Sequence, residues 1–325
     1  MNKQSNRDAI NNFMKMTGAS KVYLYGGAAI DRYINPEAEI MDYDIAIQDP
    51  DEYVAVVDKL KTEGFDVGNT RLAFNLSTVA KHPEHGVFDL ACMDIEKNGI
   101  YNLEKFYIEY SSDYPWGKAV DRFNTVHCLR EGRIIPINNP DEEKAYDLLR
   151  RFSVLAGKYG FSLECDGING DTINTIHRRL KETPLNKENR HSRVRCLARF
   201  MGAVLRSKHQ DEFLRSMGQT ELMSYAYPEI NNLMHNEKFI IGVKEKRIEN
   251  KLDLIDRMLE YTDNRDDLVD EILLLTQRER DREDPKVIQM VEGLEGEKTS
   301  AQRLKNDILN PVFSYIIAGK GKGKF

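Results

Sequence analysis

Two acidic residues and two glycines near the start of the chain have the types and spacing needed to bind nucleotide phosphates. Asp42 and Asp44 lie two positions apart in the segment DYDIAI. Because side chains two positions apart in a strand share a face, both carboxylates point the same way. Gly26 and Gly27 follow the apolar run VYLY, and glycine lets the backbone come close to a ligand. Together these features predict a Mg²⁺ site beside a phosphate-binding turn.

The elements that must position these residues follow from the hydrophobic periodicity. We expect a strand over 22–25, then a helix over 28–34 whose free N–H groups face an anion, and a strand over 42–47. An amphipathic helix over 5–17 and a second helix over 52–63 are expected to cover the sheet, the second after a cap at Asp49-Pro50-Asp51.

A hairpin is expected over 72–94, with LAFNLSTVA and VFDLACMD as its strands. The second strand carries Asp89, a lone carboxylate on an otherwise apolar strand. Burying an unpaired carboxylate is costly, so Asp89 either faces solvent at a sheet edge or shares a cation with other acids. With Asp42 and Asp44 it completes a set that can hold two Mg²⁺ ions. Such a site activates an attacking hydroxyl and stabilises the departing pyrophosphate.

Composition sets the protein class. With 325 residues and 41% hydrophobic content, the chain can bury a real core in two or three domains. Its apolar runs are too short to span a membrane, and MNKQSNRDAI lacks the layout of a signal peptide, which predicts a cytoplasmic protein that does not bind membranes. The four cysteines are Cys92, Cys128, Cys165 and Cys196. They are far apart and form no CxxC pair, which argues against a zinc ribbon.

Charge is spread unevenly along the chain. The net charge is −6, yet residues 178–215 hold eleven Lys/Arg against four Asp/Glu. This local excess is typical either of a polyanion-binding face or of a solvated helix surface. Within it, 192–206 reads as a helix whose arginines lie off the apolar stripe.

The first ~95 residues resemble the nucleotidyltransferase fold of the DNA polymerase beta superfamily. The wording GGAAIDR…DYDIAI is most similar to tRNA nucleotidyltransferases (CCA-adding enzymes) and bacterial poly(A) polymerases. The resemblance implies transfer of a nucleoside monophosphate from ATP or CTP to an RNA 3′-hydroxyl, with tRNA as the expected acceptor and two Mg²⁺ ions as cofactors. It implies that the catalytic and metal-binding residues are Asp42, Asp44 and Asp89, and that the triphosphate contacts are Gly26, Gly27 and Arg32.

Two further segments resemble the family in part. Asp121-Arg122-Phe123-Asn124 stands where the family has Arg-Arg-Asp-Phe-Thr, which makes Arg122 a nucleotide contact by resemblance; a surface ion pair with Asp121 is the alternative. Asp147-x-x-Arg150, on a helix expected over 142–160, resembles the base-pairing Glu-Asp-x-x-Arg helix but has Tyr146 in place of Glu. A salt bridge on the helix surface is the alternative for this pair.

The rest of the chain reads as helical. A strand-turn-strand is expected around Glu131-Gly132, and two charged helices, exposed or forming a coiled arm, over 244–261 and 265–280. In an enzyme that extends RNA, the basic helix over 192–206 is expected to contact acceptor phosphates. Its RNA-binding residues are Arg193, Arg195, Arg199 and Arg206.

The sequence therefore predicts an α+β protein, with a mixed-sheet nucleotidyltransferase domain followed by an all-α region. The expected divisions are a catalytic domain over 1–137, a helical nucleotide- and RNA-binding domain over 138–235, a charged helical region over 236–310 and a flexible basic tail over 311–325. Two alternatives stay open: the same fold acting on a protein or small-molecule acceptor, as in nucleotidyltransferase toxins, and a non-catalytic RNA-binding or structural protein.

Overall fold

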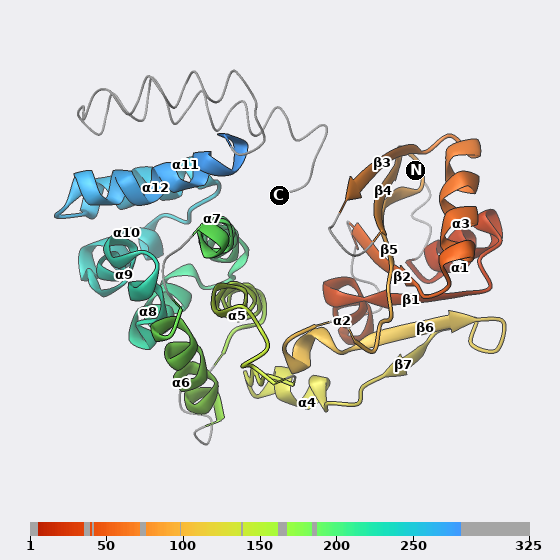
Figure 1. Ribbon diagram of the computed structural model, residues 1–325, viewed down its shortest axis with the longest axis horizontal. Coiled ribbons are helices and arrows are strands. Elements are labelled where there is room, and N and C mark those ends of the chain that lie inside the picture. The colour runs from red at the N-terminus through yellow and green to blue at the C-terminus, as the bar shows by residue number, and fades with distance from the viewer. Residues whose placement is uncertain are drawn as a thin grey trace. The chain divides into compact units, whose positions relative to one another are not determined.

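The computed structural model describes residues 6–35, 40, 42–71, 76–97, 99–137, 139–161, 168–183 and 187–280. The chain forms two compact units, Met1–Arg130 and Glu131–Phe325 (Figure 1). The first is built on a sheet, and the described part of the second is helical, which confirms the α+β class. No helix in the described ranges is long and apolar enough to cross a membrane. Cys165, residues 72–75 of the expected hairpin and everything after residue 280 lie outside the described residues.

Seven strands form the sheet of the first unit, in the order β3-β4-β5-β2-β1-β6-β7. The strands β2 and β5 are parallel, and the other neighbours are antiparallel. Their bounds are β1 Lys21–Tyr25, β2 Asp42–Ile47, β3 Asp66–Arg71, β4 Leu76–His82, β5 Gly86–Cys92, β6 Tyr107–Ser111 and β7 Lys118–Val120. The expected hairpin is present as β4 and β5.

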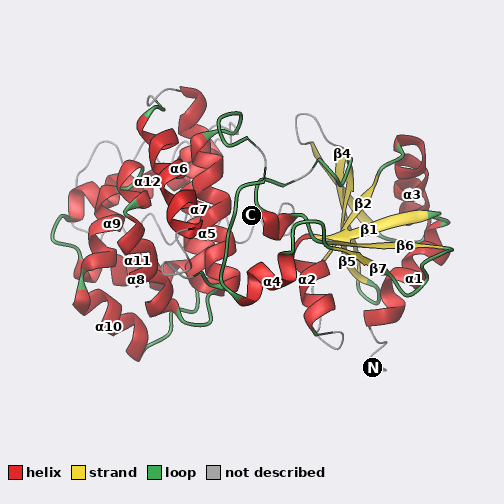
Figure 2. Cartoon of the chain, turned by 90° about the horizontal axis from the view of Figure 1, so that it is seen from below, coloured by secondary structure: helices red, strands yellow, loops and turns green. Residues whose placement is uncertain are grey.

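One face of the sheet is covered by helices α1 (Asn6–Thr17), α2 (Gly26–Ile34) and α3 (Pro50–Thr62) (Figure 2). Phe13 of α1 packs on Phe88 of β5 with ring centroids 4.8 Å apart, and Tyr43 of β2 stacks on the same ring. Tyr43, Ile45 and Ile47 of β2 are buried on this face, as the alternation of DYDIAI predicts. Asp42 and Asp44 consequently point to the opposite face.

Local capping explains where two helices of this unit begin. The Asp49 carboxylate accepts from the Glu52 N–H at 2.8 Å, so the expected cap of α3 is confirmed. The expected strand-turn-strand around Glu131-Gly132 is wrong, because α4 (Thr125–Arg130) fills the segment before it. The Asp121 carboxylate accepts from the Thr125 N–H at 2.6 Å and from the Val126 N–H at 3.1 Å, which supplies the partners that a first helical turn needs.

The second unit is a stack of helices. They are α5 Ala145–Tyr159, α6 Ile168–Lys181, α7 Lys187–Arg206, α8 Gln210–Thr220, α9 Pro228–His235, α10 Glu237–Glu245, α11 Lys251–Tyr261 and α12 Arg265–Arg280. The expected helix over 244–261 begins only at Lys251, where Asn250 accepts from the Asp253 N–H. Leu254 of α11 and Leu268 of α12 are fully buried, so the prediction of an exposed or coiled arm is wrong for these two faces.

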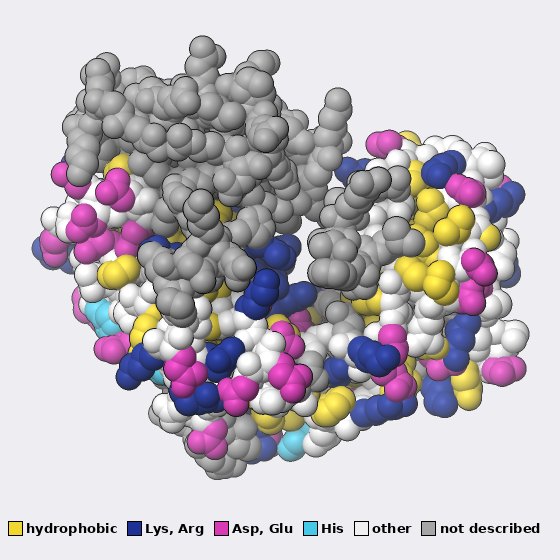
Figure 3. All heavy atoms as spheres, viewed as in Figure 1, with side chains coloured by type: hydrophobic (Ala, Val, Ile, Leu, Met, Phe, Trp, Pro, Cys, Tyr) yellow, Lys and Arg dark blue, Asp and Glu magenta, His cyan; other side chains and the backbone are white. Residues whose placement is uncertain are grey.

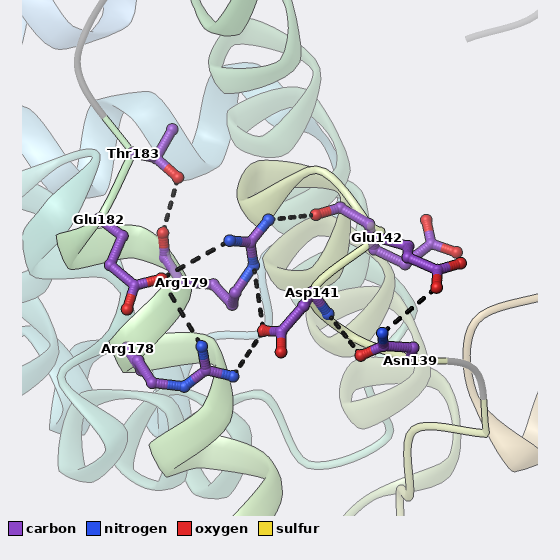
Figure 4. A network of polar contacts seen from close by, with 8 residues as sticks. Asn139, Asp141, Glu142, Arg178, Arg179, Glu182 and Thr183 are labelled. Atoms are coloured by element: carbon purple, nitrogen blue, oxygen red, sulfur yellow. Dashed lines mark hydrogen bonds and ion pairs between the residues drawn. The ribbon is translucent and has the colours of Figure 1, made fainter.

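A polar network holds the segment before α5 against α6 (Figure 4). Arg178 donates to the Asp141 carboxylate at 2.7 Å, and Arg179 donates to the Glu143 carbonyl at 2.9 Å. Asp141 therefore does not cap α5, which begins at Ala145. Both arginines also lie 3.6 Å from Glu182. Acidic neighbours thus balance part of the basic excess counted over 178–215.

Helices α5 and α7 cross in close contact at Gly157. A Cβ atom at this position would lie 2.7 Å from both the Cβ and the carbonyl oxygen of Ala203. We expect Gly157→Ala to lower the free energy of unfolding by about 1–2 kcal/mol, since the overpacking exceeds the gain in helix propensity. Urea unfolding checks this, with Gly170→Ala in α6 as the matched control. No atom lies within 4 Å of a Cβ there, so the control will leave stability unchanged or raise it slightly.

The carboxylate of Glu271 on α12 caps the N-terminus of α9. It accepts from the Glu229 N–H at 3.0 Å and from the Ile230 N–H at 3.2 Å. Burial nevertheless raises the pKa of Glu271 to about 7 from an ordinary 4.5, while these N–H groups and Arg193 oppose the rise. The folded state therefore binds this proton more tightly than the unfolded chain does.

We expect the stability that comes from protonated Glu271 to be present below pH ~4.5 and lost as the pH rises through ~7, a change of about 3 kcal/mol. Urea unfolding of the wild type and of Glu271→Gln across this window checks the sign. The variant will lack that part of the slope. An identical slope in both proteins would contradict the raised pKa.

Candidate active site

The pairing of β2 with β5 brings the expected carboxylates together. Asp44 lies directly opposite Asp89 in this parallel pair, where neighbouring strands run about 4.8 Å apart. Asp42 comes two residues earlier on the same face of β2. Asp42 is exposed, and Asp44 and Asp89 are half-buried. All three residues therefore lie on the face of the sheet that α1 and α3 leave uncovered.

The Gly-Gly turn lies against this group of acids. Gly26 has φ +65°, and a Cβ atom on it would be 3.3 Å from Oδ2 of Asp44. Both the backbone conformation and the close approach therefore require glycine. Helix α2 begins at Gly26 itself, two residues earlier than expected, so the N–H groups of its first turn are presented beside Asp44. The arrangement suits a ligand that carries both phosphates and a cation.

The donor chemistry of the site suits Mg²⁺, which prefers carboxylate oxygens. In the part of the chain that the structure describes, no three His, Cys, Asp or Glu side chains converge closely enough to hold a metal ion. The expected pair of Mg²⁺ ions accordingly stays a prediction. What the structure contributes is the adjacency of Asp44 and Asp89 in the register.

Arg32 lies away from the carboxylates. Its side chain is buried in the helix-covered face, beside Tyr43 and Tyr110. Burial raises the pKa of both phenols, and the nearby guanidinium opposes the rise. Because Tyr43 points away from Asp42 and Asp44, Arg32 occupies the opposite side of the sheet. This placement gives no support to its expected contact with the triphosphate.

Arg122 lies in the loop after β7 and pairs with Glu96 at 2.5 Å. Both side chains are about half exposed, so the pair contributes little stability and can exchange partners at low cost. The alternative pairing with Asp121 is not seen, because the Asp121 carboxylate caps α4. Arg122 therefore remains a candidate contact for an anionic ligand.

Asp147 and Arg150 bind each other on α5. Nε of Arg150 donates to Oδ1 of Asp147 at 2.9 Å, and the arginine side chain is only 8% exposed. Burial lowers the pKa of Arg150, and the neighbouring Arg151 lowers it further. Tyr146, which replaces the expected Glu, is a core residue. The pair is an i, i+3 salt bridge, as the alternative prediction had it, but it is mostly buried and does not lie on the exposed helix surface.

Five arginines gather where α5 packs on α7, and we name them the arginine cluster: Arg150, Arg151, Arg195, Arg199 and Arg206. Burial, followed by the charges of the other four, lowers the pKa of Arg199 to about 10. Among the described residues, no acidic side chain pairs with Arg195, Arg199 or Arg206. Lys and Arg side chains gather beside α5 and α7 in the middle of Figure 3.

Arg193 does not belong to the arginine cluster. Its Nε donates to the Ala226 carbonyl at 2.7 Å, and its guanidinium lies 4.9 Å from the centre of the Tyr227 ring. The Tyr227 hydroxyl in turn donates to the Arg193 carbonyl at 2.5 Å. Arg193 therefore ties α7 to the segment before α9, and its guanidinium has partners within the helical unit.

Solved structures decide what fold this is. No family model and no curated protein matches the sequence. A tRNA-processing enzyme in an apo form superimposes with a TM-score of 0.59 at 14% sequence identity. The match covers 98% of this chain and 92% of that enzyme's chain. The chain has the fold of CCA-adding enzymes. Two further structures with this fold hold ligands, one with tRNA and the other with CTP.

The Thermotoga maritima CCA-adding enzyme complexed with tRNA has a TM-score of 0.55 at 15% identity, and the match covers 90% of this chain and 74% of that one. A CCA-adding enzyme complexed with CTP has a TM-score of 0.56 at 15% identity, covering 94% and 74%. The CCA-adding fold thus extends over both units, and the resemblance seen in GGAAIDR…DYDIAI is confirmed at the level of the fold.

Proposed function

We propose that this protein is a template-independent nucleotidyltransferase that moves a nucleoside monophosphate from ATP or CTP to an RNA 3′-hydroxyl and releases pyrophosphate. The observation that carries the proposal is the adjacency of Asp44, Asp89 and Gly26 on one face of the sheet. The fold supports it, since structures of that fold have been solved with tRNA, ATP and CTP.

Each residue of the site has a role in this reaction. The N–H groups at Gly26 and Gly27 bind the β- and γ-phosphates and orient them for in-line attack. Asp42, Asp44 and Asp89 would hold Mg²⁺, which supplies Lewis-acid activation of the hydroxyl and stabilises the negative charge on pyrophosphate. Asp44 and Asp89 are half-buried on paired strands, so the β2–β5 ladder sets the spacing of their backbones.

The expected acceptor is an RNA. Among RNAs we favour tRNA, because a structure of the same fold was solved with tRNA. The arginine cluster is a concentrated positive charge on two packed helices, and a phosphate backbone has the charge to neutralise it. Within it, Arg195, Arg199 and Arg206 are the proposed phosphate contacts. Contacts of this kind position RNA without reading its sequence.

A labelling assay with the full chain tests the proposal. Purified protein is incubated with Mg²⁺, total RNA and each α-labelled nucleoside triphosphate in turn, and the RNA and protein products are then separated. We expect label in RNA with release of pyrophosphate. Label in protein would favour the toxin-like alternative. RNA binding without pyrophosphate release would favour a non-catalytic protein.

A further inference from the structure

The loop between β6 and β7 presents Trp116, the single tryptophan of the chain. Its side chain is 77% exposed, more than any other large hydrophobic side chain among the described residues. Tyr114 on the same loop and Phe123 after β7 are also exposed. Single exposed apolar residues are common on proteins, whereas several aromatic rings in one short segment are typical of an interaction surface.

Local structure holds this loop in one shape. The Gly117 N–H donates to the Tyr114 carbonyl at 3.0 Å, which closes a β-turn. Pro115 fixes φ at the second position of the turn, and Trp116 occupies the third. Gly117 has φ +83°, and a Cβ atom on it would lie 2.6 Å from the Ile108 side chain, so the turn is seated tightly on β6. Because the loop is already ordered, a partner that covers Trp116 pays little entropy to fix it.

The strand β7 lies at one edge of the sheet (Figure 1). It pairs with β6 on one side, and no strand in the described ranges pairs with its other side. Lys118 and Ala119 on this strand are exposed. A free edge offers backbone N–H and C=O groups to another strand. Since β7 is short, such pairing supplies only a few hydrogen bonds, and a stable contact needs side chains as well.

A pocket of about 410 Å³ opens beside β7. Tyr107 and Val120, which lie opposite each other in the β6–β7 pair, form part of its apolar lining with Ile95. The Tyr23 ring meets the Tyr107 ring edge to face 5.6 Å away. Arg122 lines the pocket beyond the end of β7. The volume is ample for one aromatic side chain, and a guanidinium is a favourable neighbour for its ring.

The charges that line this pocket balance one another. Lys21 pairs with Glu109 at 2.8 Å. Arg122 pairs with Glu96 at 2.5 Å. The remaining charged residues of the lining are one cation and one anion, Lys118 and Asp121. A polyanion such as RNA gains little from a neutral surface, whereas a second copy of the same surface meets no net repulsion.

We propose that two copies of the chain associate through β7, with Trp116 of each copy entering this pocket of the other. Trp116 comes three residues before Ala119, and Arg122 comes three residues after it. Antiparallel pairing of two β7 strands about a two-fold axis at Ala119 therefore sets each Trp116 opposite Arg122 of the other copy. A ring before the strand and a pocket that extends past its end make the contact self-complementary. This association does not depend on the proposed transfer reaction.

Analytical ultracentrifugation of the full chain tests the association. We expect a monomer–dimer equilibrium between about 1 and 100 µM, since a short edge and one anchoring ring make a weak interface. Trp116→Ala is expected to raise the dissociation constant about 30-fold, the effect of losing a tryptophan at the centre of an interface. Val54→Ala removes an exposed apolar side chain from α3 and, as the matched control, will leave the equilibrium unchanged. A wild type that is monomeric throughout this range would overturn the proposal.

Trp116 fluorescence gives a second readout, because no other tryptophan contributes to it. As the dimer forms, we expect the emission to shift to shorter wavelength and quenching by acrylamide to fall. Val120→Lys places a charge in the pocket and keeps the reporter, so its emission will stay that of an exposed indole at every concentration. Circular dichroism shows whether this variant is folded; if it is not, Trp116→Ala decides.

Three results would refute the contact. The first is a dimer in which Trp116 remains fully quenchable, and the second is a dimer that survives Val120→Lys in a folded protein. The third is Trp116 emission that changes only when RNA is added, which would assign the loop to RNA binding instead.

Discussion

Replacing both Asp42 and Asp44 with Asn will lower nucleotide transfer to RNA by about 10³-fold or more, without unfolding the protein. The substitutions keep the side-chain shape, so Gly26 can still pack near residue 44, but they remove two of three negative charges beside the phosphate turn. Losing the charges that bind a catalytic cation costs several kcal/mol of transition-state stabilisation. The labelling assay measures the loss.

The control for this variant is Asp58→Asn on α3. Asp58 is exposed and pairs with Lys61 on its own helix, so its loss is expected to leave activity unchanged. Circular dichroism and urea unfolding report whether each variant is folded. A folded Asp42→Asn, Asp44→Asn protein with full activity would show that these carboxylates take no part in transfer, and the proposed function would be abandoned.

The second large effect is expected in the arginine cluster. Replacing Arg195 and Arg199 with Gln is expected to weaken RNA binding about 10- to 100-fold near physiological salt, because two of the proposed phosphate contacts are lost. It will also reduce the slope of log affinity against log salt concentration by about 2. Filter binding or fluorescence titration at several salt concentrations measures both quantities.

Arg215→Gln is the matched control for this pair. Arg215 belongs to the same basic segment but is held by Glu237 in an exposed bidentate ion pair, so it is expected to leave the salt slope unchanged. The double variant will unfold at the same or a higher urea concentration, since it relieves repulsion around Arg199. If the salt slope of the double variant equals that of the wild type, α7 is not part of the RNA-binding surface.

Much of the sheet unit could be predicted because its signals are local. The alternation of DYDIAI fixes which side chains of β2 are buried, and Asp49-Pro50 marks the start of α3. The hairpin of β4 and β5 follows from two alternating runs around a short turn. The strand β3, by contrast, is the polar edge strand DVGNTR, and no periodicity distinguishes it from a loop.

Partner choice was harder to predict than secondary structure. Arg32 reads as a ligand contact next to two glycines, yet it lies on the same buried face of α2 as Ala28 and Ala29, which helical spacing alone could have shown. Asp121 reads as the partner of Arg122, but its carboxylate caps α4. Asp44 and Asp89 could be grouped in one site from residue type and resemblance, but their direct pairing joins strands far apart in the chain, and the strand register is what shows it.

The close crossing at Gly157 has a consequence for how the helical unit responds to its ligands. Because Gly157 lets α5 and α7 approach closely, the guanidinium groups of the two helices lie near one another. The repulsion between these charges opposes the packing of the two helices. An anion bound there relieves that repulsion and favours the folded state by mass action. RNA or polyphosphate would thus act as a structural counterion, and the melting temperature of the unit should report its occupancy.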